Sequence, residues 1–160
     1  MTSTAQLPKW LKAFNRVIMA LQRLGLAIGT MRVLAVPGRK SGQLRRTPVS
    51  PLAVDGQRYI IGGLAEADWV KNARAAGWGI LAHGCRQEQV ALVELPVEQR
   101  GPILRAFPRE VPHGVQFFHQ LYQLPKDGAA LPEAFAALAR HCPVFRIEAL
   151  PATHKRTGAA

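Results

Sequence analysis

The chain has 160 residues, of which 48% are hydrophobic, and it carries a formal net charge of +11. This length suits one domain with a sizeable core, and the ordinary apolar content excludes a disordered body. The charge favours anionic partners and is uneven, since residues 1–54 contain nine Lys or Arg and no Asp or Glu. The small and polar ends, residues 1–6 and 152–160, are expected to be disordered.

No secretory signal is evident, because Arg23 interrupts the early apolar segment, so we expect a cytoplasmic protein. Its two cysteines, Cys85 and Cys142, are then expected to be free thiols. The longest apolar run, residues 24–31, is too short to span a bilayer. Neither cysteine belongs to a pattern with zinc-ligand spacing, so we expect no metal site.

Residues 8–24 predict an amphipathic helix, because apolar residues recur at helical spacing while Lys and Arg fall mostly on the other side. Two interpretations of this helix are open. It docks on the core of the protein, or it lies on an anionic membrane surface as a peripheral contact.

The rest of the chain alternates between strand-like and helical patterns. We predict strands at 31–36, 49–54, 57–63, 80–83, 89–95 and 143–149, and helices at 68–76, 97–107, 113–124 and 132–141. Asp55-Gly56 is typical of a hairpin turn, and Pro48 and Pro51 favour an edge strand or a bulge. These antiparallel hairpins with helices around them predict an α+β fold in a single domain, with residues 31–150 closing into a small barrel.

The most informative stretch is the basic loop at residues 38–48, which combines four cations, two hydroxyl side chains and two glycines. Glycines bring backbone N–H groups close to an anion, Arg45 can bind it with a bidentate fork, and Lys40 adds a point charge. This pattern indicates a pocket for a phosphate-bearing ligand. A solvated hairpin turn without a ligand is the other interpretation.

A second element lies at the end of the predicted strand 57–63 and the start of the helix after it. Gly62 and Gly63 would let a flat ligand approach the backbone, and Trp69 and Asn72 lie three residues apart on one helix face. A simple turn followed by a core tryptophan would explain the same residues.

Taken together, these motifs resemble the deazaflavin-dependent nitroreductase family. The resemblance covers about half the chain and rests on the order and spacing of Gly38-Arg39-Lys40-Ser41-Gly42, Arg45, Thr47-Pro48, Asp55-Gly56, the segment 69–77 and the closing segment 141–148. It implies a split β-barrel like that of flavin mononucleotide (FMN)-binding proteins. It also implies binding of coenzyme F420, a deazaflavin with a phosphate-linked, glutamate-rich tail.

The resemblance assigns roles to residues in four groups. It implies that the phosphate and tail are held by Arg39, Lys40, Ser41 and Arg45. It implies that the next part of the groove is lined by Arg46, Thr47, Pro48, Val49 and Ser50. The deazaflavin ring would meet the backbone of Gly62 and Gly63, and the site would be closed by Asp68, Trp69 and Asn72.

The activity implied by the resemblance is hydride transfer between reduced F420 and a small, apolar or aromatic electrophilic acceptor. Candidate residues on the acceptor side lie on the predicted helix 113–124, where Phe118 and Tyr122 share a face. Tyr122 and His119 are the catalytic candidates, because His119 could donate a proton to the reduced acceptor, while core packing is the alternative for Phe117 and Phe118.

Two other functions remain open at this level. One is an FMN-dependent enzyme, although a shorter tail with one phosphate makes less use of so many cations. The other is a non-catalytic cofactor- or lipid-binding module of the same fold at a membrane surface. Nucleic-acid binding is not expected, because the cations are dispersed and the loop lacks interleaved aromatic residues for base stacking. The sequence does not specify an oligomeric state.

Overall fold

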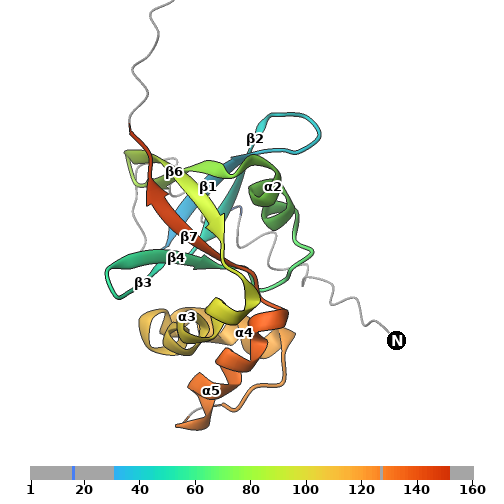
Figure 1. Ribbon diagram of the computed structural model, residues 1–160, viewed down its shortest axis with the longest axis vertical. Coiled ribbons are helices and arrows are strands. Elements are labelled where there is room, and N and C mark those ends of the chain that lie inside the picture. The colour runs from blue at the N-terminus through green and yellow to red at the C-terminus, as the bar shows by residue number, and fades with distance from the viewer. Residues whose placement is uncertain (1–15, 17–30, 127, 152–160) are drawn as a thin grey trace, which may run out of the picture.

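The computed structural model describes residues 16, 31–126 and 128–151. The predicted helix over 8–24, apart from helical and exposed Arg16, and the predicted tail over 152–160 lie outside these residues. The described part forms a curled antiparallel sheet with strand order β2-β1-β5-β6-β7-β4-β3 and helices packed around it (Figure 1). The strands are β1 (Arg32–Pro37), β2 (Leu44–Val49), β3 (Leu52–Val54), β4 (Gln57–Ile61), β5 (Trp78–His83), β6 (Arg86–Glu94) and β7 (Val144–Ala149).

The link between β2 and β3 explains why this sheet forms a barrel. The two strands lie at opposite ends of the strand order, yet only Ser50 and Pro51 separate them in the chain. The three Cα–Cα steps from Val49 to Leu52 span at most about 11 Å, so the two edges of the sheet have to approach each other. No ladder joins β2 to β3, because β2 pairs with β1 and β3 pairs with β4. The result is the predicted α+β split β-barrel.

The same link corrects the predicted strand over 49–54. β2 begins earlier, at Leu44 inside the basic loop, and ends at Val49, and a separate short strand begins at Leu52. The strand breaks there because Pro51 lacks a backbone N–H for a ladder. The edge position predicted from Pro48 is confirmed, and the predicted Asp55-Gly56 hairpin turn is present with both residues at positive φ.

Four α-helices accompany the described part of the sheet: α2 (Asp68–Ala76), α3 (Val97–Glu110), α4 (Val115–Leu121) and α5 (Ala130–Ala136). Short 3-10 helices, η1 (Pro112–Gly114) and η2 (Ala137–Arg140), precede α4 and follow α5. Helices α3, α4 and α5 gather at one end of the barrel, whereas α2 lies beside the β1–β2 hairpin (Figure 1). No helix among the described residues has the length and apolar character needed to cross a membrane.

Three helical predictions differ from the structure. The helix predicted over 132–141 is α5, which ends at Ala136, followed by the 3-10 helix η2. The other two differ for reasons of packing. α3 continues through Pro108 to Glu110, because Phe107 and Val111 are both buried and their packing offsets one lost hydrogen bond. The helix predicted over 113–124 stops at Leu121, because Tyr122 is extended and its hydroxyl binds the barrel. Asp68 is the first residue of α2, a position where its charge suits the helix dipole.

The buried side chains form two clusters. One fills the barrel and includes Leu34, Val36, Ile60, Val90 and Phe145. The other lies under the helices at the barrel end and is rich in aromatic rings, with Phe107, Phe118 and Phe135 in mutual contact. A cavity opens between the barrel and this second cluster.

Candidate functional site

A cavity of about 430 Å³ lies where the end of β2, the end of β4, the start of α2 and the η1–α4 segment meet. Its walls are largely apolar, with Trp69, Ile61 and the rings of α3 and α4. Among the described residues that line it, none is Asp, Glu, Lys or Arg; they are Met31, Thr47, Pro48, Val49, Ser50, Ile61, Gly63, Leu64, Ala67, Trp69, Phe107, His113, Gly114, Gln116, Phe117, Phe118 and Gln120. Such a cavity suits an uncharged, flat, mostly apolar group.

Two side chains distant in the sequence, Tyr122 and Cys142, contact the backbone carbonyl of Gly63. The Tyr122 hydroxyl donates to the Gly63 carbonyl at 2.7 Å, and the Cys142 thiol lies 3.8 Å from the Tyr122 oxygen and 3.9 Å from the same carbonyl. Burial raises the pKa of Tyr122 above its ordinary value and raises the pKa of the Cys142 thiol to about 11. Both groups are therefore protonated at neutral pH, and Tyr122 acts as a fixed donor to the backbone.

Side chains cover the two glycines that were expected to offer bare backbone. A Cβ on Gly63 would overlap the ring of Phe117, and one on Gly62 would lie 3.0 Å from Val70 and 3.3 Å from Trp69. The glycines thus permit aromatic side chains to pack on the strand end. In this conformation Phe117 covers the Gly63 position that the resemblance assigns to a ring.

Arg39 ties the basic loop to the start of α2. Its backbone N–H and Nη1 donate to the Asn72 side-chain oxygen at 3.1 and 2.8 Å, and its Nη2 donates to Asp68 at 3.1 Å. Asn72 is 5% exposed, so this contact positions the loop from a buried residue. Arg39, Asp68 and Asn72 are therefore brought together, but none of them lines the cavity.

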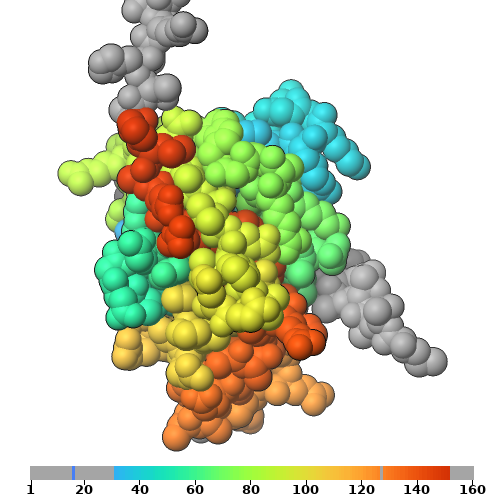
Figure 2. Space-filling model, in the orientation of Figure 1, coloured from blue at the N-terminus to red at the C-terminus, as the bar shows by residue number. Residues whose placement is uncertain are grey.

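The other cations of the hairpin, Lys40, Arg45 and Arg46, have no ion pair among the described residues. The loop at residues 38–43, which contains Lys40 and precedes Arg45 and Arg46, is closed by its own hydrogen bonds, from the Gly38 N–H to the Gln43 carbonyl and from the Gly42 N–H to the Gly38 carbonyl. The Ser41 hydroxyl accepts the Gln43 N–H. The loop stands out from the barrel as the blue-to-cyan projection in Figure 2.

The strand register relates these cations to the cavity. Arg45 faces Val36 and Thr47 faces Leu34 across the β1–β2 ladder, so Arg45 and Thr47 point to the same side of β2. Thr47 lines the cavity, and the next position on that side toward the loop is Arg45. Arg46 points to the opposite side. A ligand lying in the cavity with an anionic extension along β2 would therefore meet Arg45 first.

The structure brings some of the predicted residues to the cavity and leaves others away from it. Six predicted binding residues line it: Thr47, Pro48, Val49, Ser50, Gly63 and Trp69. Phe117 and Phe118 also line it, whereas Gly62, His119 and Tyr122 do not.

Sequence reasoning did not single out His113, Gln116 and Gln120, which together with Thr47 and Ser50 form the polar part of the wall. Their spacing of three and four residues, shared with Phe117, was the available signal for one common face.

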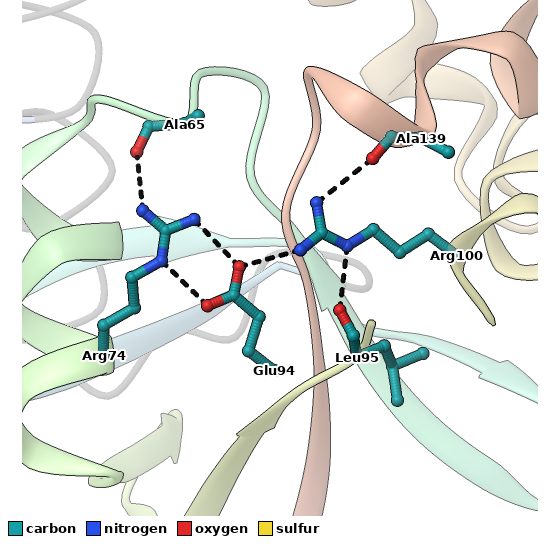
Figure 3. A network of polar contacts seen from close by, with 6 residues as sticks. All are labelled: Ala65, Arg74, Glu94, Leu95, Arg100 and Ala139. Carbon is teal, nitrogen blue, oxygen red and sulfur yellow. Dashed lines mark hydrogen bonds and ion pairs between the residues drawn. The ribbon is translucent and has the colours of Figure 1, made fainter. Parts of the chain in front are cut away.

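An ion-pair network supports the loop that lines the cavity (Figure 3). Glu94 accepts hydrogen bonds from Arg74 at 2.8 Å and from Arg100 at 3.0 Å, and Arg74 also reaches the Ala65 carbonyl at 3.4 Å. Arg100 is 8% exposed and donates to the carbonyls of Leu95 and Ala139 as well. The network thus joins α2, β6 and α3 around the segment between β4 and α2.

Among the comparisons with known proteins, only the search of solved structures finds similar proteins. No protein-family model and no curated protein matches the chain. Among solved structures, one described as a domain-swapped dimer covers 87% of this chain and 97% of its own at 16% identity and a TM-score of 0.51. A protein of unknown function from Agrobacterium tumefaciens covers 92% of this chain and 59% of its own, at 10% identity and the same TM-score.

A structure described as an F420-H2 dependent reductase covers 74% of this chain and 94% of its own, at 18% identity and a TM-score of 0.49.

Proposed function

We propose that this protein is an oxidoreductase that binds coenzyme F420 and transfers hydride between the reduced deazaflavin and a small, apolar or aromatic acceptor. The observation that carries the proposal is a largely apolar cavity beside hairpin cations: within the part of the chain that the structure describes, no charged residue lines the cavity and Lys40, Arg45 and Arg46 have no ion pair. A cofactor with a flat, aromatic ring system and a polyanionic tail matches both parts. The motif resemblance in the sequence points to the same cofactor.

The residues of this chain can be assigned to parts of that cofactor by chemistry. Arg45 and Lys40 would bind the phosphate and tail carboxylates, with Arg46 and Ser41 adding charge and a hydroxyl nearby. Arg39 would act through Asn72 and Asp68, because its guanidinium is already engaged there. Thr47–Ser50 and Trp69 would enclose the ring, with Phe117 moving from the face of Gly63 if the ring lies there.

The chemistry of the reaction comes mainly from the cofactor. When bound, reduced F420 supplies a hydride from carbon 5 of its deazaflavin ring. The protein contributes orientation through Trp69 and the β2 backbone, charge neutralisation through the hairpin cations, and exclusion of water through the aromatic wall. Tyr122 holds the Gly63 carbonyl and is a positioning residue in this scheme, because its hydroxyl is committed to that bond.

The first experiment is a fluorescence titration of the purified protein with oxidised F420, beside FMN, at low and high salt. We expect F420 to bind more tightly than FMN and to weaken as salt rises, because exposed cations are screened. Arg45→Ala is expected to weaken F420 binding by about tenfold or more, the size of one hydrogen bond to a charged group.

Arg86→Ala is the matched control. Arg86 is also an exposed arginine without an ion pair among the described residues, but it lies in the β5–β6 hairpin. Because Val33 pairs with Ala82, that hairpin lies near the start of β1, whereas the basic loop follows its end. Equal losses in both variants would indicate nonspecific attraction, and a preference for FMN would contradict the proposal.

A further inference from the structure

The mouth of the barrel at the start of β1 gathers polar side chains on the inner face of the sheet. The inner positions further along four strands hold apolar residues of the barrel cluster: Leu34, Leu81, Ile60 and Val90. Side chains two positions away on the same strands point to the same side, and at this mouth they are Arg32, His83, Arg58 and Glu88. None of these four lines the cavity.

Two guanidinium groups share one carboxylate at this mouth. Arg58 donates from Nη1 and Nη2 to the two carboxylate oxygens of Glu88, and the two side chains are 39% and 41% exposed, so a ligand can reach them. Burial lowers the pKa of the Arg32 guanidinium, the nearby charge of Arg58 lowers it further, and Glu88 raises it. Within this group of residues, two positive charges therefore face one negative charge.

His83 adds a buried nitrogen next to Arg32. Val33 pairs with Ala82 in the β1–β5 ladder, so Arg32 and His83 are the next residues toward the mouth on two neighbouring strands. The His83 Nε2 atom is buried and has no hydrogen-bond partner within the described part of the chain. A buried polar atom without a partner costs free energy, which a ligand that supplies the missing hydrogen bond restores.

We propose that this mouth binds a carboxylate group between Arg32 and His83. One carboxylate oxygen accepts from the Arg32 guanidinium, which has five N–H donors, and the other accepts from Nε2–H of the neutral His83 tautomer. A single negative charge matches the surplus positive charge, whereas Glu88 disfavours a ligand with two negative charges, such as phosphate. The site is separate from the cavity, and the proposal does not depend on the cofactor.

Two probes of nearly equal shape test this site. The purified protein is titrated with acetate and with neutral acetamide at constant ionic strength, while the amide signals of Arg32 and His83 and the ring nitrogens of His83 are followed by NMR. We expect acetate to cause saturable changes and to shift His83 toward the Nε2-protonated tautomer. Acetamide should bind at least tenfold more weakly, because it lacks the charge. N-acetylglycine, whose carboxylate resembles that of a peptide end, distinguishes the source: tighter binding than acetate indicates a peptide end, and equal binding indicates a free small carboxylate.

Three variants assign the binding to particular side chains. Arg32→Met and His83→Phe should each weaken acetate binding by about tenfold, the size of a hydrogen bond to a charged group. Glu88→Gln should tighten it, because this change removes a repelling carboxylate and releases Arg58 from its ion pair. The amide spectrum of each variant verifies its fold.

Two control variants separate this site from general attraction to a basic protein. Arg146 lies on β7 next to the inward-facing Ile147, so it points to the outer face of the same sheet, and Arg146→Met should retain binding. Arg45→Ala removes a hairpin cation and should leave the acetate-induced changes at His83 unaltered.

Equal effects of acetate and acetamide on the unaltered protein would overturn the proposal. So would a loss in Arg146→Met as large as that in Arg32→Met, or unchanged acetate affinity in both Arg32→Met and His83→Phe. The titrations contain no deazaflavin, so a failure here is distinct from a failure to bind F420.

Discussion

At the scale of single residues, Gly63 is a point of close contact between the end of β4 and the helical segment around α4. Its carbonyl accepts the Tyr122 hydroxyl, and its α-carbon is covered by Phe117 and Leu121. A side chain at this position would have to displace both of these hydrophobic groups. Gly63 is therefore required by packing, independently of any ligand.

Gly63→Ala tests this interpretation. The added methyl overlaps the Phe117 ring, so we expect the free energy of unfolding in urea to fall by about 1–3 kcal/mol. The control is Gly101→Ala in α3, where an added Cβ meets nothing within 4 Å apart from its chain neighbours. That variant should change stability by less than about 1 kcal/mol, because the helix preference of alanine is opposed by crowding between its Cβ and the ring of Pro102. An unchanged free energy of unfolding in Gly63→Ala would contradict this interpretation, because it would mean that Phe117 moves aside at little cost.

At the scale of elements, the network around Glu94 joins two helices to one strand. Arg74 comes from α2, Glu94 from the end of β6 and Arg100 from α3, and the Ala65 carbonyl links the network to the loop between β4 and α2. Leu64 and Ala67 of that loop line the cavity. The network therefore stabilises this loop and, with it, one wall of the cavity.

Arg100→Ala is expected to destabilise the protein by about 2–4 kcal/mol. The substitution removes the donor to two backbone carbonyls and one of the two partners of Glu94 in a largely buried position. Arg109→Ala in the same helix removes an exposed arginine and should change stability by less than about 0.5 kcal/mol. Chemical unfolding of both variants measures the difference, and equal effects would contradict the role given to the network.

At the scale of the whole molecule, a net charge of +11 is distributed so that the carboxylates stabilise the fold and the hairpin keeps its cations. Glu88 pairs with Arg58 between β6 and β4, and Glu94 joins the network described above. These ion pairs hold the pKa of both glutamates below the ordinary value. The arginines of the β1–β2 loop and strand receive little of this compensation.

The lowered pKa of Glu94 predicts sensitivity to acid. Because the folded pKa lies below the unfolded value near 4.5, the stabilisation is complete above that pH and is lost as the pH falls through the folded pKa. We expect the melting temperature to decrease once the pH is below about 4.5. In Glu94→Gln the melting temperature should be lower at neutral pH and should decrease less steeply with acid. Glu148→Gln, which breaks the exposed pair with Arg146, should follow the unaltered protein. Parallel curves for all three proteins would contradict this assignment.

Much of this architecture could be predicted from local patterns. The α+β class, the Asp55-Gly56 turn, the bounds of α2 and the edge position of Pro48 depend on periodicity, turn chemistry and proline, which act between near neighbours in the chain. The split β-barrel was implied by the family resemblance instead. The basic character of the hairpin is likewise a property of consecutive residues. Such features are legible in a sequence because their causes are short-range.

The composition of the site depended on contacts between distant segments. The contact between Ser50 and His113 joins residues that are 63 positions apart in the chain. The hydrogen bond from Tyr122 to the Gly63 carbonyl spans 59 positions, and the one from Arg39 to Asn72 spans 33. No local pattern encodes these distances, because they arise when the two-residue β2–β3 link draws the sheet edges together and α4 packs on the strand end. Residue types therefore indicated what could bind, and three-dimensional packing determined which of them line the cavity.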